Sequence, residues 1–483
     1  MSRFPRMLAA ALTAAAIAAP SAVAQAPTVQ VPATGADYVT SPNVEYLGHI
    51  VYDVGQTTGA RIIGTKLYVT SAKNLSIYDI SKPETPQLLG TLKLNIAWEN
   101  EEVPTNGKIL GIANDWFDLM PSCNVPDPTV THCQQLFDVR DPANIKELPS
   151  LPDNGDHTSD CAYDCDFLFG NTGNVTDLRG VLDGKTPDRF ADWHAPINAA
   201  LAERGFKPVK SCHHIREITP GYLFAACQPY VYFHVKQSDL ENHIVNPEIL
   251  DAGMNPDGRF VHSVRWPRDG QDKFAFEGGE TNFTFTNGNP VDSCDHKTNG
   301  AFAVVEPQPD GTFSQPISEY RPVTGTYTDG NTATHIAGCS VHWFQEHPSF
   351  HNGGLVALAA YDNGVRFLQI TPEGKIVEQG YFQPLGFETS SAKWVPGTDI
   401  VYSIDYARGI DILRWKGDHY VPDANGVVHA EKGRIAGTRG KQPVLPALTP
   451  SQKAFAVRTV NLLHAQGWFY GYCQLAAEHG NSQ

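Results

Sequence analysis

One hairpin-like pattern recurs along this chain and constrains its fold more than any other feature. Each copy is an apolar strand, a short polar turn and a second strand that ends in an aromatic or aliphatic pair. The clearest copies cover residues 67–80, 222–235, 355–370 and 400–415. Alternating apolar residues bounded by turn residues are typical of β-hairpins. The 42 glycines and 35 prolines also favour many short strands and turns over long helices.

Three weaker copies begin near Leu110, Phe167 and Phe274, which brings the number of copies to seven. Successive copies begin between 43 and 81 residues apart. A four-stranded propeller blade takes about 40 to 50 residues, so each interval holds one blade and its loops. The sequence therefore predicts an all-β fold, a β-propeller of about seven four-stranded blades over residues 43–440.

A related tetrapeptide stands ahead of several hairpins. It occupies residues 263–266, 340–343 and 391–394, with looser forms at 161–164 and 214–217. We interpret it as the innermost strand of each blade, where small residues let the blades crowd around the axis. The alternative is chance similarity among β-rich segments.

Potential metal ligands lie just ahead of this tetrapeptide in four consecutive blades. They are Asp160, His213, His262 and Cys339, with His157, His214 and His342 close by as alternates. Equivalent positions on successive blades converge at the central channel, and imidazole and thiolate ligands suit zinc, copper or iron. The alignment therefore predicts a transition-metal site there. The alternative is a set of unrelated histidines, with Cys339 in a disulfide.

Two adjacent acids, Glu101 and Glu102, can also supply carboxylates to the channel. Adjacent residues on a strand point to opposite faces. The preferred interpretation is therefore a solvated strand edge, and a pair of catalytic acids is the alternative.

Two repeats carry a recognisable signature. Residues 77–83 read Ile-Tyr-Asp-Ile-Ser-Lys-Pro, and residues 136–142 read Leu-Phe-Asp-Val-Arg-Asp-Pro. These segments resemble the repeat of LVIVD-type β-propellers, in which a strand ends in Asp-Ile or Asp-Val and Pro follows shortly. The resemblance covers roughly residues 44–416 and is sharp in these two repeats only. It implies an extracellular or surface propeller and assigns no catalytic residues.

The N-terminus has the three parts of a secretory signal peptide. Two arginines precede an apolar stretch from Met7 to Ala19, and Ala22-Val-Ala24 forms a cleavage site. The sequence predicts a signal peptide over 1–24, a flexible lead over 25–42 and a secreted or periplasmic protein. The net charge of −16 disfavours nucleic acid and anionic membranes as partners. No later segment is apolar enough to predict membrane insertion.

Nine cysteines in an oxidising compartment are expected to pair for the most part, with at least one left over. Cys123 and Cys133 form the preferred disulfide, because both lie in one Pro- and Asn-rich insertion. Cys473 is the expected leftover, and the other pairings stay open.

Two helices are predicted outside the strands. One covers 192–204 as an insertion over one face. The other covers 454–466 in a C-terminal tail of residues 441–483, after a capping box that runs from Thr449 to Gln452.

Two functions fit this chain. The first is a binding or scaffolding propeller that offers one face to an extracellular or surface protein, glycan or small molecule. The second is a metal-dependent oxidoreductase or hydrolase with its ion at the channel histidines. Whether the chain is an enzyme stays open, because a propeller hosts both roles.

Overall fold

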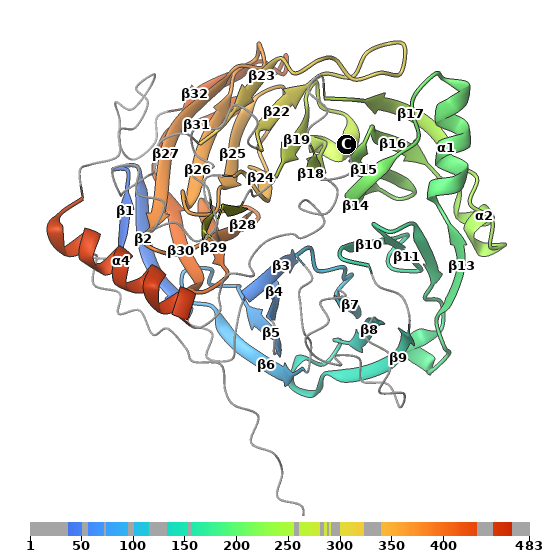
Figure 1. The fold of residues 1–483 in the computed structure, drawn as a ribbon, viewed down its shortest axis with the longest axis horizontal. Helices are drawn as coiled ribbons and strands as arrows, with labels where there is room; N and C mark the ends of the chain where they lie inside the picture. Colours follow the sequence, from blue (N-terminus) through green and yellow to red (C-terminus); the bar gives the residue numbers. More distant parts are fainter. Residues whose placement is uncertain are drawn as a thin grey trace, which may run out of the picture.

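The computed structural model describes residues 37–50, 57–71, 74–94, 101–114, 133–152, 156–255, 260–280, 285–286, 289–290, 300–322, 340–431 and 448–465. Within these ranges, seven antiparallel sheets stand around one central axis (Figure 1). The prediction of an all-β propeller with seven blades is therefore confirmed. Blades are numbered here in chain order.

Four blades consist of four strands in succession, with the first strand nearest the axis. Blade 1 contains β3 (Thr57–Ile63), β4 (Lys66–Ser71), β5 (Asn74–Asp79) and β6 (Gln87–Lys93). Blade 3 contains β10 (Ser159–Ala162), β11 (Phe167–Gly170), β12 (Asn174–Asp177) and β13 (Asp188–Asp192). Blade 4 contains β14 (Lys210–Thr219), β15 (Tyr222–Gln228), β16 (Tyr230–His234) and β17 (Glu248–Gly253). Blade 5 contains β18 (Val261–Arg265), β19 (Ala275–Gly279), β22 (Phe302–Val305) and β23 (Ser318–Tyr320).

Blade 2 departs from this plan at its innermost position. Its sheet contains β7 (Ile109–Asn114), β8 (Cys133–Asp138) and β9 (Lys146–Pro152). Residues 101–105 take the place of a regular inner strand. Thr105 bridges to Leu110, and the N–H of Gly111 donates to the carbonyl of Pro104 at 2.9 Å. The chain at Glu101 is thereby brought to the channel.

The last two blades include the N-terminal strands. Blade 6 contains β24 (Phe344–Glu346), β25 (Gly354–Ala359), β26 (Val365–Ile370) and β27 (Ile376–Pro384), and β1 (Tyr38–Thr40) adds to its outer edge. Blade 7 contains β28 (Thr389–Trp394), β29 (Ile400–Asp405), β30 (Gly409–Trp415) and, as its outermost strand, β2 (Val44–Ile50). The ring is thus closed by pairing the first part of the chain with the last. β1 lies within residues 25–42, which the sequence analysis assigned to the lead.

The core lies between neighbouring blades. Leu67 and Val69 of blade 1 pack with Tyr402 and Ile404 of blade 7. Each of the seven predicted hairpins begins within, or one residue before, the second strand of a blade. The hairpin repeat therefore located every blade.

Helices and two further hairpins lie outside the seven sheets. They are η1 (Pro142–Asn144), η2 (Val181–Asp183), α1 (His194–Glu203), α2 (Gln237–Glu241), α3 (Pro267–Gly270), α4 (Pro450–Ala465), the pair β20 (Phe285–Thr286) and β21 (Asn289–Pro290), and the pair β31 (His419–Pro422) and β32 (Val428–Glu431).

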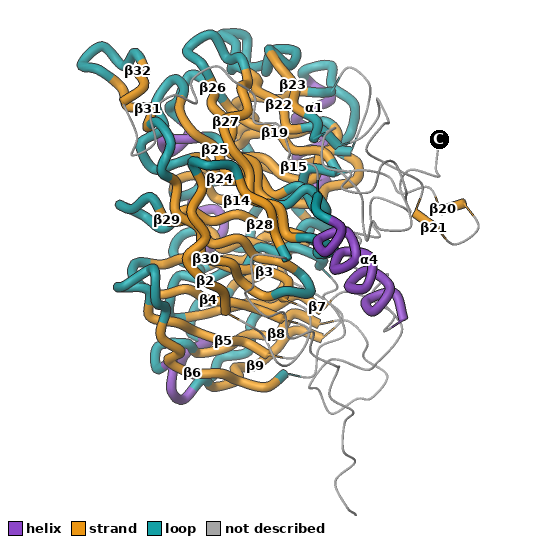
Figure 2. Tube along the Cα trace, turned by 90° about the vertical axis from the view of Figure 1, so that its left-hand side faces the viewer, coloured by secondary structure: helices purple, strands orange, loops and turns teal. Residues whose placement is uncertain are grey.

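Both predicted helices are present. α1 lies within the predicted span and buries Ile197 and Leu201 against the blade core. α4 begins at the predicted capping box, in which the N–H of Gln452 donates to Thr449 Oγ1 and the N–H of Thr449 donates to Gln452 Oε1. α4 lies on one face of the ring, and the hairpin of β31 and β32 extends from the opposite face (Figure 2). Among the described helices, none is long and apolar enough to cross a membrane.

Two disulfides join described cysteines, Cys161 with Cys165 and Cys212 with Cys227. Cys123 lies outside the described residues, so its pairing with Cys133 stays a prediction. Cys473 and the predicted signal peptide also lie outside them.

Candidate metal centre

Three imidazoles from adjacent blades meet in the channel. His213 lies on β14, His262 on β18, and His342 just ahead of β24. All three side chains are 0% exposed. The ring centroids of His213 and His262 are 3.7 Å apart, and those of His262 and His342 are 4.4 Å apart. Buried imidazole nitrogen atoms need a hydrogen-bond partner or a metal ion, so a cluster of buried histidines requires an explanation.

Two of these rings have a fixed tautomer. His213 Nδ1 lies 3.0 Å from the carbonyl oxygen of His262, and His342 Nδ1 lies 2.7 Å from the carbonyl oxygen of Ser390. A carbonyl only accepts, so in each ring Nδ1 carries the proton and donates it. The lone pair of Nε2 is then directed into the channel, as in histidines that bind metal ions.

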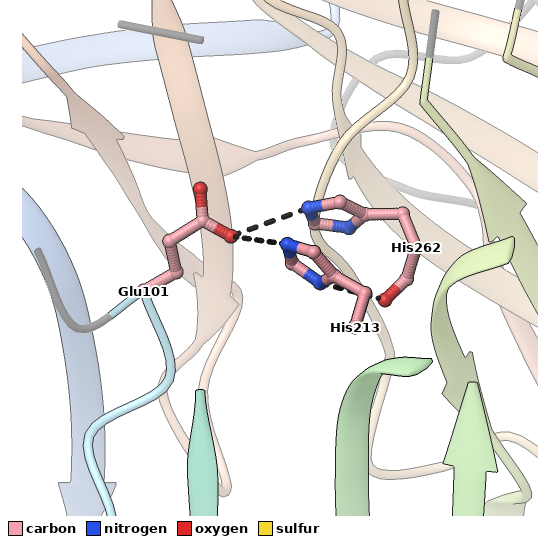
Figure 3. Close-up of side chains that lie close together, drawn as sticks. All are labelled: Glu101, His213 and His262. Carbon is pink, nitrogen blue, oxygen red and sulfur yellow. Dashed lines mark hydrogen bonds and ion pairs between the residues drawn. The ribbon is translucent and has the colours of Figure 1, made fainter. Parts of the chain in front are cut away.

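The carboxylate of Glu101 faces these nitrogen atoms from blade 2. Glu101 Oε2 is 3.7 Å from His213 Nε2 and 3.2 Å from His262 Nε2 (Figure 3). Glu101 Oε1 is 3.1 Å from His342 Nε2. Trp343 Nε1 and the hydroxyl of Tyr406 donate to Glu101 at 3.0 and 2.9 Å. Glu101 is therefore held in place by neutral donors while it faces the imidazoles.

A second carboxylate completes the cluster. Glu280 follows β19, is buried, and places Oε2 3.9 Å from His262 Nε2. The hydroxyl of Tyr361 donates to its other oxygen. His262 is thus shared by two groups with ligand spacing: one with Glu101 and His213, the other with Glu280 and His342.

Burial and the charges within the cluster together set the pKa values of its members. Burial, followed by the charge of neighbouring imidazoles, holds the pKa of His213 well below its usual value and lowers that of His262 to about 3. Burial alone would raise the pKa of Glu101, but His342 and His262 outweigh it and hold that pKa well below the usual range. In contrast, Glu101 outweighs the effect of burial and raises the pKa of His342. Metal ions bind neutral imidazoles beside an ionised carboxylate, so an ion here would displace the proton that Glu101 favours on His342.

The spacing within each of the two groups is compatible with a bound ion. Ligands at 2.0–2.1 Å from a tetrahedral zinc ion lie about 3.3 Å from one another. The distances from Glu101 to the three Nε2 atoms are 3.1 to 3.7 Å. Within the described residues, the three Nε2 atoms have no hydrogen-bond partner apart from these carboxylates, and Glu280 Oε2 accepts no hydrogen bond. Three imidazoles and a carboxylate suit zinc, copper or iron.

The predicted ligands divide into three groups. The structure brings His213 and His262 together, and His342, an alternate, joins them. Cys339 lies outside the described residues. Asp160 is not in this cluster, because its carboxylate binds Arg61 at 2.8 Å.

The other two alternates lie beside the cluster. The ring of His157 is 4.8 Å from that of His213. The ring of His214 meets the indole of Trp343 edge-on at 4.7 Å. His214 follows His213 on a strand and therefore points to the other side.

From the sequence, a channel position for Glu101 was given only as the less favoured alternative, and Glu280 was missed. Glu101 and Glu102 were interpreted as a solvated edge, but they are 0% and 2% exposed. Their opposite orientation was predicted correctly, since Glu101 faces the imidazoles and Glu102 faces Lys393. Glu280 carried no signal in the sequence, because it lies beyond the end of a second strand.

A further group with ligand spacing is partly exposed. It consists of His347, Asp399 and His419. His419 Nε2 is 3.6 Å from Asp399 Oδ1. This surface triad contains one imidazole fewer than the channel cluster and serves below as a control.

Comparisons with known proteins return similarity in fold only. No protein-family model and no curated protein matches this chain. The β-propeller domain of Cps50 (Swd1) from Myceliophteria thermophila is similar with a TM-score of 0.48 and 11% identity, over 77% of this chain and 99% of that one. A protein from Lactobacillus plantarum gives 0.45 and 10%, over 79% and 95%. The computationally designed Ika8 protein gives 0.39 and 12%, over 77% and 99%. Similarity at this level assigns no function.

Proposed function

We propose that this protein is an exported β-propeller that binds one divalent transition-metal ion in its central channel. The fold fits a binding or scaffolding module. The observation that carries the metal proposal is the convergence of three imidazole Nε2 atoms on Glu101, from four different blades, with no competing hydrogen bond among the described residues.

The closed geometry supports a structural ion. His213, His262, His342, Glu101 and Glu280 are each at most 3% exposed. Structural metal sites are closed by protein ligands, whereas catalytic sites keep an open position for substrate. The ion would tie blades 2, 4, 5 and 6 together at the axis. This burial lends no support to the hypothesis of a metal-dependent enzyme.

Export and an outside partner are parts of the same proposal. The signal-like N-terminus supports export, and the two described disulfides are consistent with an oxidising compartment. With the channel closed, the outer faces of the ring are the surfaces left to bind a protein, glycan or small molecule. The resemblance to LVIVD-type repeats supports the same assignment.

The test is a metal titration of the chelator-stripped protein with Zn²⁺ and Cu²⁺. We expect one tightly bound ion per chain and a rise in Tm on loading, because an ion that binds only the folded state adds about 2.7 kcal/mol at 100 times its Kd. His262→Ala removes the ligand shared by both groups and is expected to lower the affinity at least 100-fold.

The matched control is His419→Ala, which removes an imidazole from the surface triad. It should leave the channel stoichiometry unchanged. Retention of the tight ion by His262→Ala, or its loss in His419→Ala, would contradict the proposal.

A further inference from the structure

A second layer of charged side chains lies along the innermost strands. On β14 and β18 it lies three residues beyond the channel histidine. Its basic members are Arg61 on β3, Arg216 on β14, Arg265 on β18 and Lys393 on β28. Each pairs in strand register with an aromatic residue, in order Tyr68, Phe224, Phe276 and Tyr402. The shared pairing shows that the four cations occupy equivalent positions in their blades.

Three of these cations have carboxylate partners. Arg61 binds Asp160 at 2.8 Å, and Lys393 binds Glu102 at 2.5 Å. Arg265 forms a bidentate pair with Glu346, at 2.5 and 3.0 Å. Three cations are therefore matched by three anions.

Arg216 is left without such a partner. Within the described residues, its one carboxylate inside 4 Å is Glu102 at 3.9 Å, and Glu102 is already bound by Lys393. Its side chain is 20% exposed. Burial, followed by repulsion from Arg265 and Arg61, lowers the pKa of Arg216 to about 10. With a side chain that is 20% exposed and its closest described carboxylate at 3.9 Å, Arg216 is the least closely paired cation of this layer.

This guanidinium opens onto a pocket of about 110 Å³. Arg265, Glu346 and the segment of α3 line the same pocket. Three acids line this pocket; two of them are engaged and the third is exposed. Glu346 is held by Arg265, Glu217 accepts from the N–H groups of Tyr163 and Gly221, and Asp269 is exposed at the rim. The volume admits one small group rather than a nucleotide or a sugar chain.

The indole of Trp343 separates this layer from the metal cluster. Its Nε1 donates to Glu101, its ring lies 4.9 Å from that of His262, and Lys393 Nζ lies 5.9 Å from the ring centroid. The two layers are therefore distinct sites on one axis.

We propose that the channel mouth at Arg216 and Arg265 binds a small monoanionic oxyanion, such as a carboxylate group or dihydrogen phosphate. A guanidinium presents two parallel N–H groups to the two oxygens of such a ligand. One bound anion would neutralise the single unmatched cation of the layer. This site is independent of the metal centre.

Thermal shift at constant ionic strength tests the proposal, with sodium acetate and sodium phosphate each compared with sodium chloride. We expect a saturable rise in Tm with acetate, with phosphate or with both, and its loss in Arg216→Gln. A response to acetate alone would identify a carboxylate ligand, and a response to phosphate alone a phosphate ligand. Arg414→Gln, which removes a surface arginine bound to Glu45 and Glu84, should respond like the parent chain.

Two results would overturn the proposal. One is an equal rise in Tm in the parent chain and in Arg216→Gln, or no rise in either. The other is a rise that survives Arg216→Gln but disappears in His262→Ala, because the anion would then bind at the metal centre. Circular dichroism in chloride should show that Arg216→Gln is folded, since the change removes a charge with no close partner.

Discussion

Two buried arginines of this propeller have carboxylate partners at short distance. Arg408, which is 1% exposed, binds Asp37 at 2.7 Å and Asp411 at 2.8 Å. Arg366 binds Glu378 at 3.1 Å. Because removing one partner of such a pair costs more than the pair contributes, these sites are sensitive to single substitutions. Against this background, the unmatched Arg216 and the unsatisfied imidazoles of the channel stand out.

Asp405 can be used to test how burial changes the pKa of a carboxyl group. It is 0% exposed, and burial raises its pKa to about 7. Asp411 raises it further, Arg408 opposes that rise, and Glu388 is a further acid nearby. A carboxyl whose pKa is raised by folding stabilises the folded state at low pH. That contribution is lost as the pH rises from about 4 to about 7.

Asp405→Asn is expected to remove this loss. Asn keeps an oxygen for the N–H groups of Ala407 and Arg408, which donate to Asp405 Oδ1 at 3.0 and 2.9 Å. Relative to the parent chain, its free energy of unfolding should rise between pH 4.5 and 8, by at most about 4 kcal/mol. Urea unfolding at both values measures it. A difference that does not change with pH would show that Asp405 is ionised in the folded protein.

Only some members of the candidate metal centre could be predicted from the sequence. His213 and His262 were predicted because each lies directly ahead of the recurring tetrapeptide or its looser form. Asp160 was assigned to the same level by an alignment that was wrong by three residues, since it pairs with Phe169 as Arg216 pairs with Phe224. Contacts between blades decide that register, and no local pattern records them.

At the scale of the element, bulges direct the channel side chains. The innermost strands β3, β14, β18 and β28 each show a register shift next to the channel position. A bulge bends a strand and re-aims the adjacent side chain. These bulges explain why the hairpins could be predicted from alternating residues. Which residue of each inner strand reaches the channel could not be predicted in this way. The inner segment of blade 2 forms no regular strand, so alternating residues could not predict it either.

The disulfide between Cys212 and Cys227 fastens one of these bulged strands. It joins β14 to β15 immediately before His213 and closes a loop with a sequence separation of 15. Cross-linking a loop of this length stabilises a protein by roughly 3 kcal/mol, mainly by restricting the unfolded chain. Replacement of both cysteines by serine should lower the free energy of unfolding by that amount.

The other described disulfide is the control. Cys161 and Cys165 are separated by four residues, for which the same relation gives roughly 2 kcal/mol. Paired denaturant titrations of the two double variants compare them. A larger loss at Cys161 and Cys165 than at Cys212 and Cys227 would refute the predicted order.

At the scale of the whole molecule, the ring depends on its closure. β2 completes blade 7 beside β30, and β1 adds to blade 6 beside β27. Without them, two sheet edges would present unpaired backbone groups to solvent. The closed ring brings residues more than 240 positions apart, such as Glu101 and Trp343, into hydrogen-bonding distance.

Deletion tests the importance of closure. A chain that begins at residue 51 lacks β1 and β2, and we expect a broad thermal transition at lower temperature and increased aggregation. A chain that begins at residue 37 keeps both strands and should melt like the parent. Equal melting of the two shortened chains would show that closure contributes little to stability.

Anomalous diffraction from zinc-loaded crystals, recorded at the zinc absorption edge, shows directly whether the channel cluster holds a metal ion. We expect one strong peak about 2.0–2.1 Å from the Nε2 atoms of His213, His262 and His342. A channel without such a peak, with zinc found only at the surface triad of His347, Asp399 and His419, would contradict the proposed metal site.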